Sequence, residues 1–181
     1  MTTTAESLRE RLLDLEAAAA EVASAADVDT FFIIVMAVLV FLMQVGFAML
    51  EVGSVSPKNT KAVLLKNIAD VAVGALSWWL VGNAIALGPD AAGGFAGGSG
   101  FAMVQRQGTM TETHPDGKAL SVAHAEWTFG MAFAATTATI VSGAIAERVK
   151  ILAYCTFAVF ICSFIYPVVA HWGWSTGGWA S

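Results

Sequence analysis

The chain has 181 residues, of which 57% are hydrophobic and 13% are charged, and its formal net charge is −5. Its mean hydropathy is +0.69. This composition is too apolar for an ordinary soluble domain. We therefore predict a membrane protein that is embedded in the lipid bilayer. We predict that it does not bind nucleic acid.

Residues 1–29 form an acidic arm in which seven acidic side chains outnumber Arg9 and Arg11. No basic segment leads directly into an apolar run, so a cleaved signal peptide is not predicted. Apolar side chains recur at steps of four and three, which is typical of an amphipathic helix. They are Leu8, Leu12, Leu15, Ala19 and Val22. We expect this extracytoplasmic arm to lie beside the membrane and residues 30–181 to form the membrane domain.

Four runs are candidates for membrane spans. Residues 31–50 carry no charge, and at a rise of about 1.5 Å per residue they match a hydrocarbon core of about 30 Å. Residues 127–146 and 151–170 also lack charge, while the run 71–87 is shorter and is extended backwards through Leu64 and Leu65. The chain is therefore predicted to be all-α, a polytopic bundle of membrane helices.

Basic residues are concentrated in two predicted loops. Lys58 and Lys61 follow the first span, and Arg148 and Lys150 separate the third from the fourth. The acidic arm, the long loop at 88–123 and the uncharged end of the chain fall on the other side. By the positive-inside rule, the two basic loops face the cytoplasm and the N-terminus lies outside.

Lys66, Asn67 and Asp70 form a polar cluster near the start of the second span. Residues four apart share a helical face, so we expect Lys66 to pair with Asp70 beside Asn67. Packing and topology explain this cluster adequately, and a functional role is the alternative. With residues 1–181 alone, we expect the cluster to face lipid.

Small residues recur every four positions in the third span, at Ala134, Ala138, Ser142 and Ala146. Such a small-residue seam allows another helix to approach closely. We expect the seam to lack its partner when only residues 1–181 are present.

His124 and His171 are predicted to lie near the outer face, at the start of the third span and the end of the fourth. Two such histidines can ligate a haem or a metal between helices, but no further Cys or His stands at ligand spacing. A helix-end hydrogen bond is the favoured interpretation for each. We predict no metal and no cofactor, and the absence of a phosphate loop or an activated nucleophile predicts that the protein is not an enzyme.

Phe129 and Phe133 are four apart and share a face of the third span, and Trp174 follows the fourth. Aromatic side chains at this level either anchor a protein among lipid headgroups or form an electron-rich cage for a small cation. Taken by themselves, these residues favour anchoring.

Several stretches resemble the ammonium transporters of the Amt/Mep/Rh group, in the same order and at compatible spacing. The arm and the loop at 89–123 carry no part of this resemblance. The stretches are "GFAMLEVGSVSPKNT" (46–60), "LLKNIAD" (64–70), "ATIVSGAIAERVK" (138–150) and "IYPVVAHWGWSTGGWAS" (165–181). The resemblance implies an eleven-helix fold in the plasma (inner) membrane, with the N-terminus outside.

The resemblance also implies roles for individual residues. Trp174 would be the aromatic wall of an outer site that recruits ammonium or methylammonium, and Phe133 would be one ring of the gate beneath it. Phe129 would contribute to the outer site across a subunit boundary, and His171 would be a structural residue at a helix end. The implied partners are two further copies in a homotrimer and a PII-type regulatory protein on the cytoplasmic side.

Part of the family pattern is absent. The two pore-lining histidines of the family belong to later spans, so we expect the sequence to be partial and residues 1–181 alone not to conduct ammonium. Two other interpretations stay open. One is an ammonium sensor of the same family with a downstream signalling domain, and the other is a four-helix membrane subunit that binds haem or scaffolds a complex.

Overall fold

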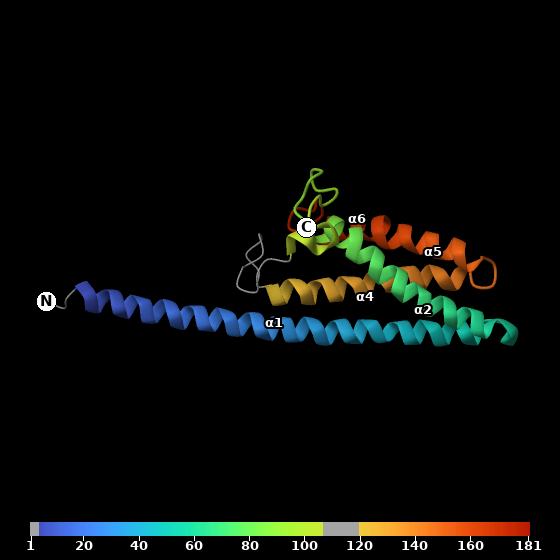
Figure 1. The fold of residues 1–181 in the computed structure, drawn as a ribbon, viewed down its shortest axis with the longest axis horizontal. Helices are drawn as coiled ribbons and strands as arrows, with labels where there is room; N and C mark the ends of the chain where they lie inside the picture. The colour runs from blue at the N-terminus through green and yellow to red at the C-terminus, as the bar shows by residue number, and fades with distance from the viewer. Residues whose placement is uncertain (1–3, 107–119) are drawn as a thin grey trace.

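The computed structural model describes residues 4–106 and 120–181 (Figure 1). Within these ranges, the side chains of residues 4–5, 19–26, 104–106 and 120–121 are outside the description. The elements in chain order are α1 (Thr4–Ser54), η1 (Pro57–Asn59), α2 (Thr60–Ser77), η2 (Trp78–Gly82), α3 (Asn83–Leu87), η3 (Phe101–Arg106), α4 (Leu120–Ala144), α5 (Ile151–Phe160), η4 (Ile161–Ile165) and α6 (Tyr166–Trp174). The described residues contain no strand, and the predicted all-α class is confirmed.

The acidic arm and the first span form a single helix, α1, of 51 residues. At about 1.5 Å per residue such a helix is about 77 Å long, more than twice the thickness of a hydrocarbon core. Its N-terminal part extends well beyond the other helices (Figure 1). Helix α1 therefore continues without interruption across residues 29–30, from the acidic arm into the first span.

Three segments of the described chain are long and apolar enough to cross a membrane, namely Asp27–Ser54, Pro57–Leu87 and Ile151–Trp174. The remaining predicted span, α4, is not among these three segments because its hydropathy is lower. It has sufficient length, 25 residues, but it is rich in alanine, threonine and glycine. Helix α4 lies against both α1 and α2, which cover much of its surface. Its threonine hydroxyls donate to backbone carbonyls one turn earlier in the same helix.

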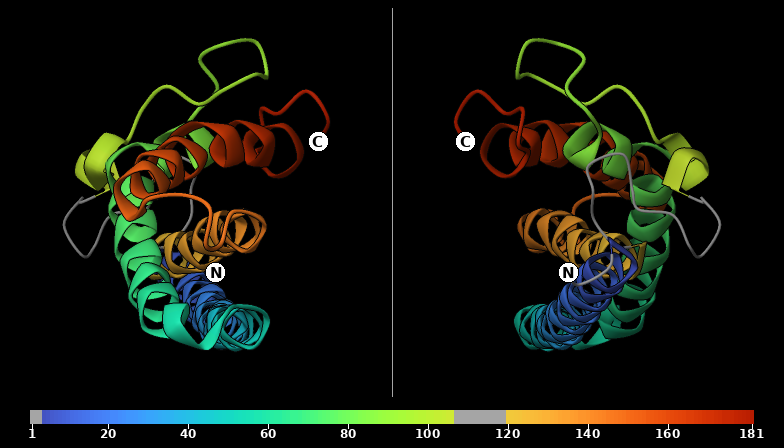
Figure 2. Two further views of the ribbon diagram at one scale, coloured as in Figure 1. Left: turned by 90° about the vertical axis from the view of Figure 1, so that its right-hand side faces the viewer. Right: turned by 90° about the vertical axis from the view of Figure 1, so that its left-hand side faces the viewer.

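The helices are arranged around α2. Seen end-on, α1 and α4 run side by side, and α2 crosses from the α1 side of the bundle to the side of α6 (Figure 2). Two π-helical turns, η2 and η4, interrupt the second and last spans. They meet where Gly82 packs on the backbone of Cys162, since a Cβ on Gly82 would lie 2.4 Å from the Cys162 carbonyl oxygen. Only glycine fits at this crossing.

The small-residue seam has its partner within the chain, so the expectation that it would lack one was wrong. Ala134, Ala138 and Ser142 are fully buried, whereas Ala146 lies beyond the end of α4. The Cys162 thiol donates to the Ala134 carbonyl at 3.3 Å, and the Tyr154 hydroxyl donates to the Ala138 carbonyl at 3.4 Å. The α5–η4 segment therefore packs along the seam.

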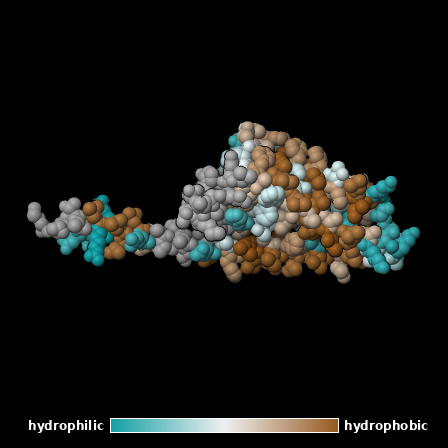
Figure 3. All heavy atoms as spheres, viewed as in Figure 1, coloured by the Kyte–Doolittle hydropathy of each residue, from teal (hydrophilic) through white to brown (hydrophobic). Residues whose placement is uncertain are grey.

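The two basic loops lie at one end of the molecule, where hydrophilic side chains gather beside a largely hydrophobic body (Figure 3). The Ser56 amide and the Asn59 side chain each donate a 2.8 Å hydrogen bond to the Glu147 carboxylate. These bonds hold the pKa of Glu147 below its usual value. Glu147 itself has a φ of 65°, in the left-handed region, so its bonds fix a tight turn between α4 and α5.

Candidate functional site

The predicted aromatic residues lie on two helices, with Phe129 and Phe133 within α4 and Trp174 at the end of α6. Phe129 and Phe133 contact each other edge to face on α4, with ring centroids 4.9 Å apart and planes at 68°. Trp174 ends α6 and is 83% exposed. Among the described residues, no ring contact joins Trp174 to either phenylalanine, so the structure brings two of the three together.

The other two tryptophans of the terminal segment hold the loop that follows α3. Trp172 donates from its indole nitrogen to the Phe95 carbonyl at 3.0 Å, and its ring packs on Phe95 and Trp179 at 5.6 and 5.8 Å. The Trp179 amide donates to the Gly94 carbonyl at 3.3 Å. Trp172 and Trp179 therefore have structural roles, while Trp174 presents its ring outward.

His171 is completely buried and engaged at the end of α6. Its Nδ1 lies 3.0 Å from the Ala86 carbonyl oxygen, and its Nε2 lies 3.6 Å from the Asp90 carboxylate. The predicted helix-end hydrogen bond is thereby confirmed for this residue. The amides of Gly94 and Ala92 donate to Asp90 and lower its pKa, and His171 beside it acts in the same direction. His124, in contrast, is exposed on α4.

A network of charged and polar side chains is buried where α1, α2 and α4 meet. Lys66 lies 3.1 Å from the Glu51 carboxylate, which also accepts hydrogen bonds from Asn67 at 3.0 Å and from Ser142 at 2.5 Å. The predicted pair of Lys66 with Asp70 was therefore wrong. Glu51, which lies one residue past the charge-free run 31–50, was not among the predicted site residues. The available signal was an acidic residue near the end of the apolar part of α1, Asp27–Ser54.

Asp70 belongs to a second set of bonds, one turn further along α2. Its carboxylate lies within hydrogen-bonding distance of the Thr139 hydroxyl, which is also 2.7 Å from the Gln44 amide oxygen. The Gln44 amide nitrogen donates to Thr136 at 3.4 Å. Asp70 is 0% exposed, so the expectation that this cluster would face lipid was also wrong. Helices α1 and α4 cover it.

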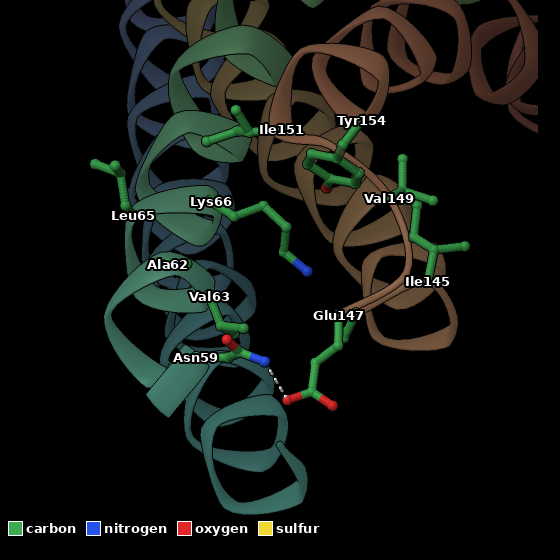
Figure 4. Close-up of a pocket in the computed structure, with 11 residues that line it drawn as sticks. Asn59, Ala62, Val63, Leu65, Lys66, Ile145, Glu147, Val149, Ile151 and Tyr154 are labelled. Carbon is green, nitrogen blue, oxygen red and sulfur yellow. Dashed lines mark hydrogen bonds between the residues drawn. The ribbon is translucent and has the colours of Figure 1, made fainter. Parts of the chain in front are cut away.

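A cavity of about 390 Å³ opens beside this network, at the end that carries the basic loops. Lys66 and Glu147 point into it from opposite walls, and Tyr154 forms part of its apolar lining (Figure 4). The Lys66 ammonium lies 5.2 Å from the centre of the Tyr154 ring. Lys66 therefore connects the cavity with the buried Glu51.

The chain is similar to known ammonium transporters. The model of the Ammonium Transporter Family matches residues 31–181. A putative ammonium transporter 1 of Caenorhabditis elegans is 39% identical over 155 residues, which are 84% of this chain and 26% of that protein. The ammonium transporter 1 member 3 of Solanum lycopersicum is 41% identical over 154 residues, 85% of this chain and 31% of that protein.

A solved structure extends the similarity to the fold. A sensor Amt protein matches with a TM-score of 0.73 and 30% sequence identity, over 85% of this chain and 37% of that chain. The chain therefore spans about a quarter to a third of the two relatives, and little more than a third of the solved chain.

Proposed function

The chain belongs to the ammonium transporter family, and from this premise we propose that it takes part in moving ammonium across a membrane. It is an integral membrane protein whose quoted stretches carry the family resemblance. The proposed substrates are ammonium and its analogue methylammonium. The membrane is the plasma (inner) membrane, with the N-terminus outside and the two basic loops in the cytoplasm.

The observation that carries the proposal is the exposed ring of Trp174 at the end of the bundle opposite the basic loops. Its neighbours Trp172 and Trp179 are fixed by the loop after α3, whereas the Trp174 ring is 83% exposed. The face of an indole ring attracts a small cation and replaces part of the hydration energy that the cation loses. Trp174 is therefore the wall of the proposed recruitment site.

Phe129 and Phe133 provide the next layer of the proposed pathway. Their edge-to-face contact gives a compact aromatic pair within α4, in the half-buried part of the bundle. A hydrophobic passage excludes ions because desolvation of a charge is very costly. Ammonium can release a proton and pass as ammonia, but potassium cannot, which supplies selectivity.

The proposal includes two kinds of partner. In a homotrimer, Phe129 contributes to the outer site of the neighbouring subunit. On the cytoplasmic side, a PII-type regulatory protein contacts the membrane domain. These assignments follow from family membership.

Methylammonium uptake by the protein in cells that lack their own ammonium transporters tests the proposal. Trp174→Leu should weaken apparent affinity roughly ten-fold, because a partly desolvated cation–π contact contributes about 1 to 2 kcal/mol. Trp179→Leu is the matched control, since Trp179 is a second exposed tryptophan of the same segment that packs on Trp172. An unchanged concentration dependence with Trp174→Leu would reduce Trp174 to a membrane anchor.

A sensor role is the second candidate, because a sensor Amt protein shares 30% identity and the fold with this chain. A sensor needs to bind ammonium without sustained uptake, whereas a transporter accumulates it. Saturable ammonium binding to the purified protein, together with no uptake in cells, would favour the sensor.

A further inference from the structure

The buried network contains three ionisable side chains whose charges do not cancel. Glu51 is 5% exposed and pairs with Lys66, and together the two are neutral. Asp70 is 0% exposed, and among the described residues it forms no ion pair with a Lys or Arg. An ionised Asp70 would therefore leave a net negative charge inside a membrane protein, where an unpaired charge is strongly disfavoured.

The other titratable groups around Asp70 do not supply the missing positive charge. They are the Tyr154 hydroxyl from α5 and the Cys162 thiol from η4, in addition to Glu51 from α1 and Lys66 from α2 itself. Tyrosine and cysteine are neutral or negative in every protonation state. Charge balance is reached when one of the two carboxyls binds a proton or a monovalent cation, and the 3.1 Å contact of Lys66 with Glu51 leaves Asp70 as that carboxyl.

The hydrogen bonds of Thr139 favour the proton. Its hydroxyl faces three oxygens at once, from the Asp70 carboxyl, the Gln44 amide and the Ala135 carbonyl at 3.1 Å. A hydroxyl has one proton, so Thr139 can donate to only one of these oxygens. A second contact is a hydrogen bond only if the other oxygen carries a proton that it donates to Thr139. A protonated Asp70 is such a donor, and it allows Thr139 to donate to Gln44.

A competing arrangement exchanges the oxygen and nitrogen of the Gln44 side-chain amide, because these two atoms are assigned from the hydrogen-bond network. Gln44 would then donate to Thr139, and Thr139 would donate to an ionised Asp70. This arrangement keeps the uncompensated charge. The second carboxylate oxygen, Oδ1, is buried with no hydrogen-bond donor among the described residues, because the Tyr154 hydroxyl, which faces Asp70, donates to the Ala138 carbonyl. The same unpartnered oxygen is less costly in a neutral acid, whose carbonyl is more weakly hydrated than a carboxylate.

We propose that Asp70 is a proton-binding site within the membrane domain and that it begins a hydrogen-bonded chain through Thr139, Gln44 and Thr136. The acid donates to Thr139, Thr139 donates to the Gln44 oxygen, and the Gln44 nitrogen donates to Thr136. Thr136 then donates to the Ala132 carbonyl at 2.8 Å, where the chain ends. The site is distinct from the aromatic residues of the proposed recruitment site and does not depend on the proposed function.

Infrared spectroscopy of the purified protein in lipid tests the site. A protonated carboxylic acid has a carbonyl stretch that a carboxylate lacks, and this band moves to lower frequency in D₂O. We expect such a band at neutral pH, its loss in Asp70→Asn, and its retention in Glu147→Gln, a control at an exposed carboxylate. Asn is neutral and can donate to Thr139, so the variant should elute as folded protein.

The absence of the band in the parent protein, or its persistence in Asp70→Asn, would overturn the site. Loss of the band on addition of sodium, potassium or ammonium would show that a cation occupies the place of the proton, and would also overturn it. If Asp70→Asn does not fold, Thr139→Val provides the test, because removal of the acceptor must shift the band, and an unshifted band contradicts the chain.

Discussion

Lys66 on α2 forms its ion pair with Glu51 on α1, at 3.1 Å, and leaves Asp70, which lies one turn further along α2, to Thr139 on α4. Lys66 and Asn67 thus connect α2 to α1 through Glu51, and Asp70 connects α2 to α4 through Thr139. The network therefore joins three helices that apolar packing alone would position less specifically.

Removing one partner of the Lys66–Glu51 pair should destabilise the protein strongly. Glu51→Gln leaves the Lys66 charge buried without compensation, and the expected loss is about 3 to 5 kcal/mol in the free energy of unfolding. Thermal or denaturant unfolding in detergent measures it. Glu51→Gln combined with Lys66→Met should recover most of the loss, and a double variant that is as unstable as the single one would contradict this explanation.

The turn at Glu147 should respond to acid. Donation from Ser56 and Asn59 lowers the pKa of Glu147 in the folded protein, so its contribution to stability is present above the unfolded pKa and is lost as the pH falls through the folded pKa. The protection of amides in the loops after α1 and α4 against hydrogen exchange, relative to their intrinsic exchange rate at each pH, should decrease over that acidic range. Glu147→Gln does not titrate, so the protection in the variant should not change over that range, and an equal decrease in the variant would contradict the assignment.

The crossing of the two π-helical turns should not tolerate a side chain at position 82. A Cβ there meets the Cys162 backbone and the ring of Trp78, so Gly82→Ala should cost about 1 to 3 kcal/mol through overpacking. Gly46→Ala is the matched control, since it lies within α1 with nothing near its Cβ and should be neutral or slightly stabilising. Equal melting temperatures for the two variants would show that the crossing is loose.

The proposed orientation can be tested with cysteines on the two ends of the bundle. A membrane-impermeant thiol reagent applied to intact cells should label Ala92→Cys, which is exposed in the loop after α3, and should not label Lys58→Cys. Labelling of the parent protein measures the background from its own cysteines, Cys155 and Cys162. Labelling at position 58 without labelling at position 92 would invert the topology and place Trp174 inside.

The helices could be predicted from the sequence because apolar runs of this length have few alternatives. The register of the seam followed from a period of four residues, and Ala134, Ala138 and Ser142 are indeed buried. The interior polar contacts could not be predicted in the same way. Spacing within α2 suggested Lys66 with Asp70, but tertiary packing brought Glu51 closer from another helix.

The π-helical turns were also beyond prediction, because a single extra residue in a turn leaves no clear periodic signal. Phe129 and Phe133 were expected on one face from their spacing, and they are in contact. Uptake measurements separate a cation site at Trp174 from a membrane anchor.

The unbroken course of α1 makes the acidic arm and the membrane span one mechanical element. A helix advances about 1.5 Å and turns about 100° with each residue, so the direction in which the arm presents Leu8 and Leu12 is set by the span below it. Insertion of one residue near position 29 would swing that apolar stripe by more than a quarter turn without altering its composition. The orientation of the apolar stripe on the arm is therefore set by the orientation of the membrane-spanning part of α1.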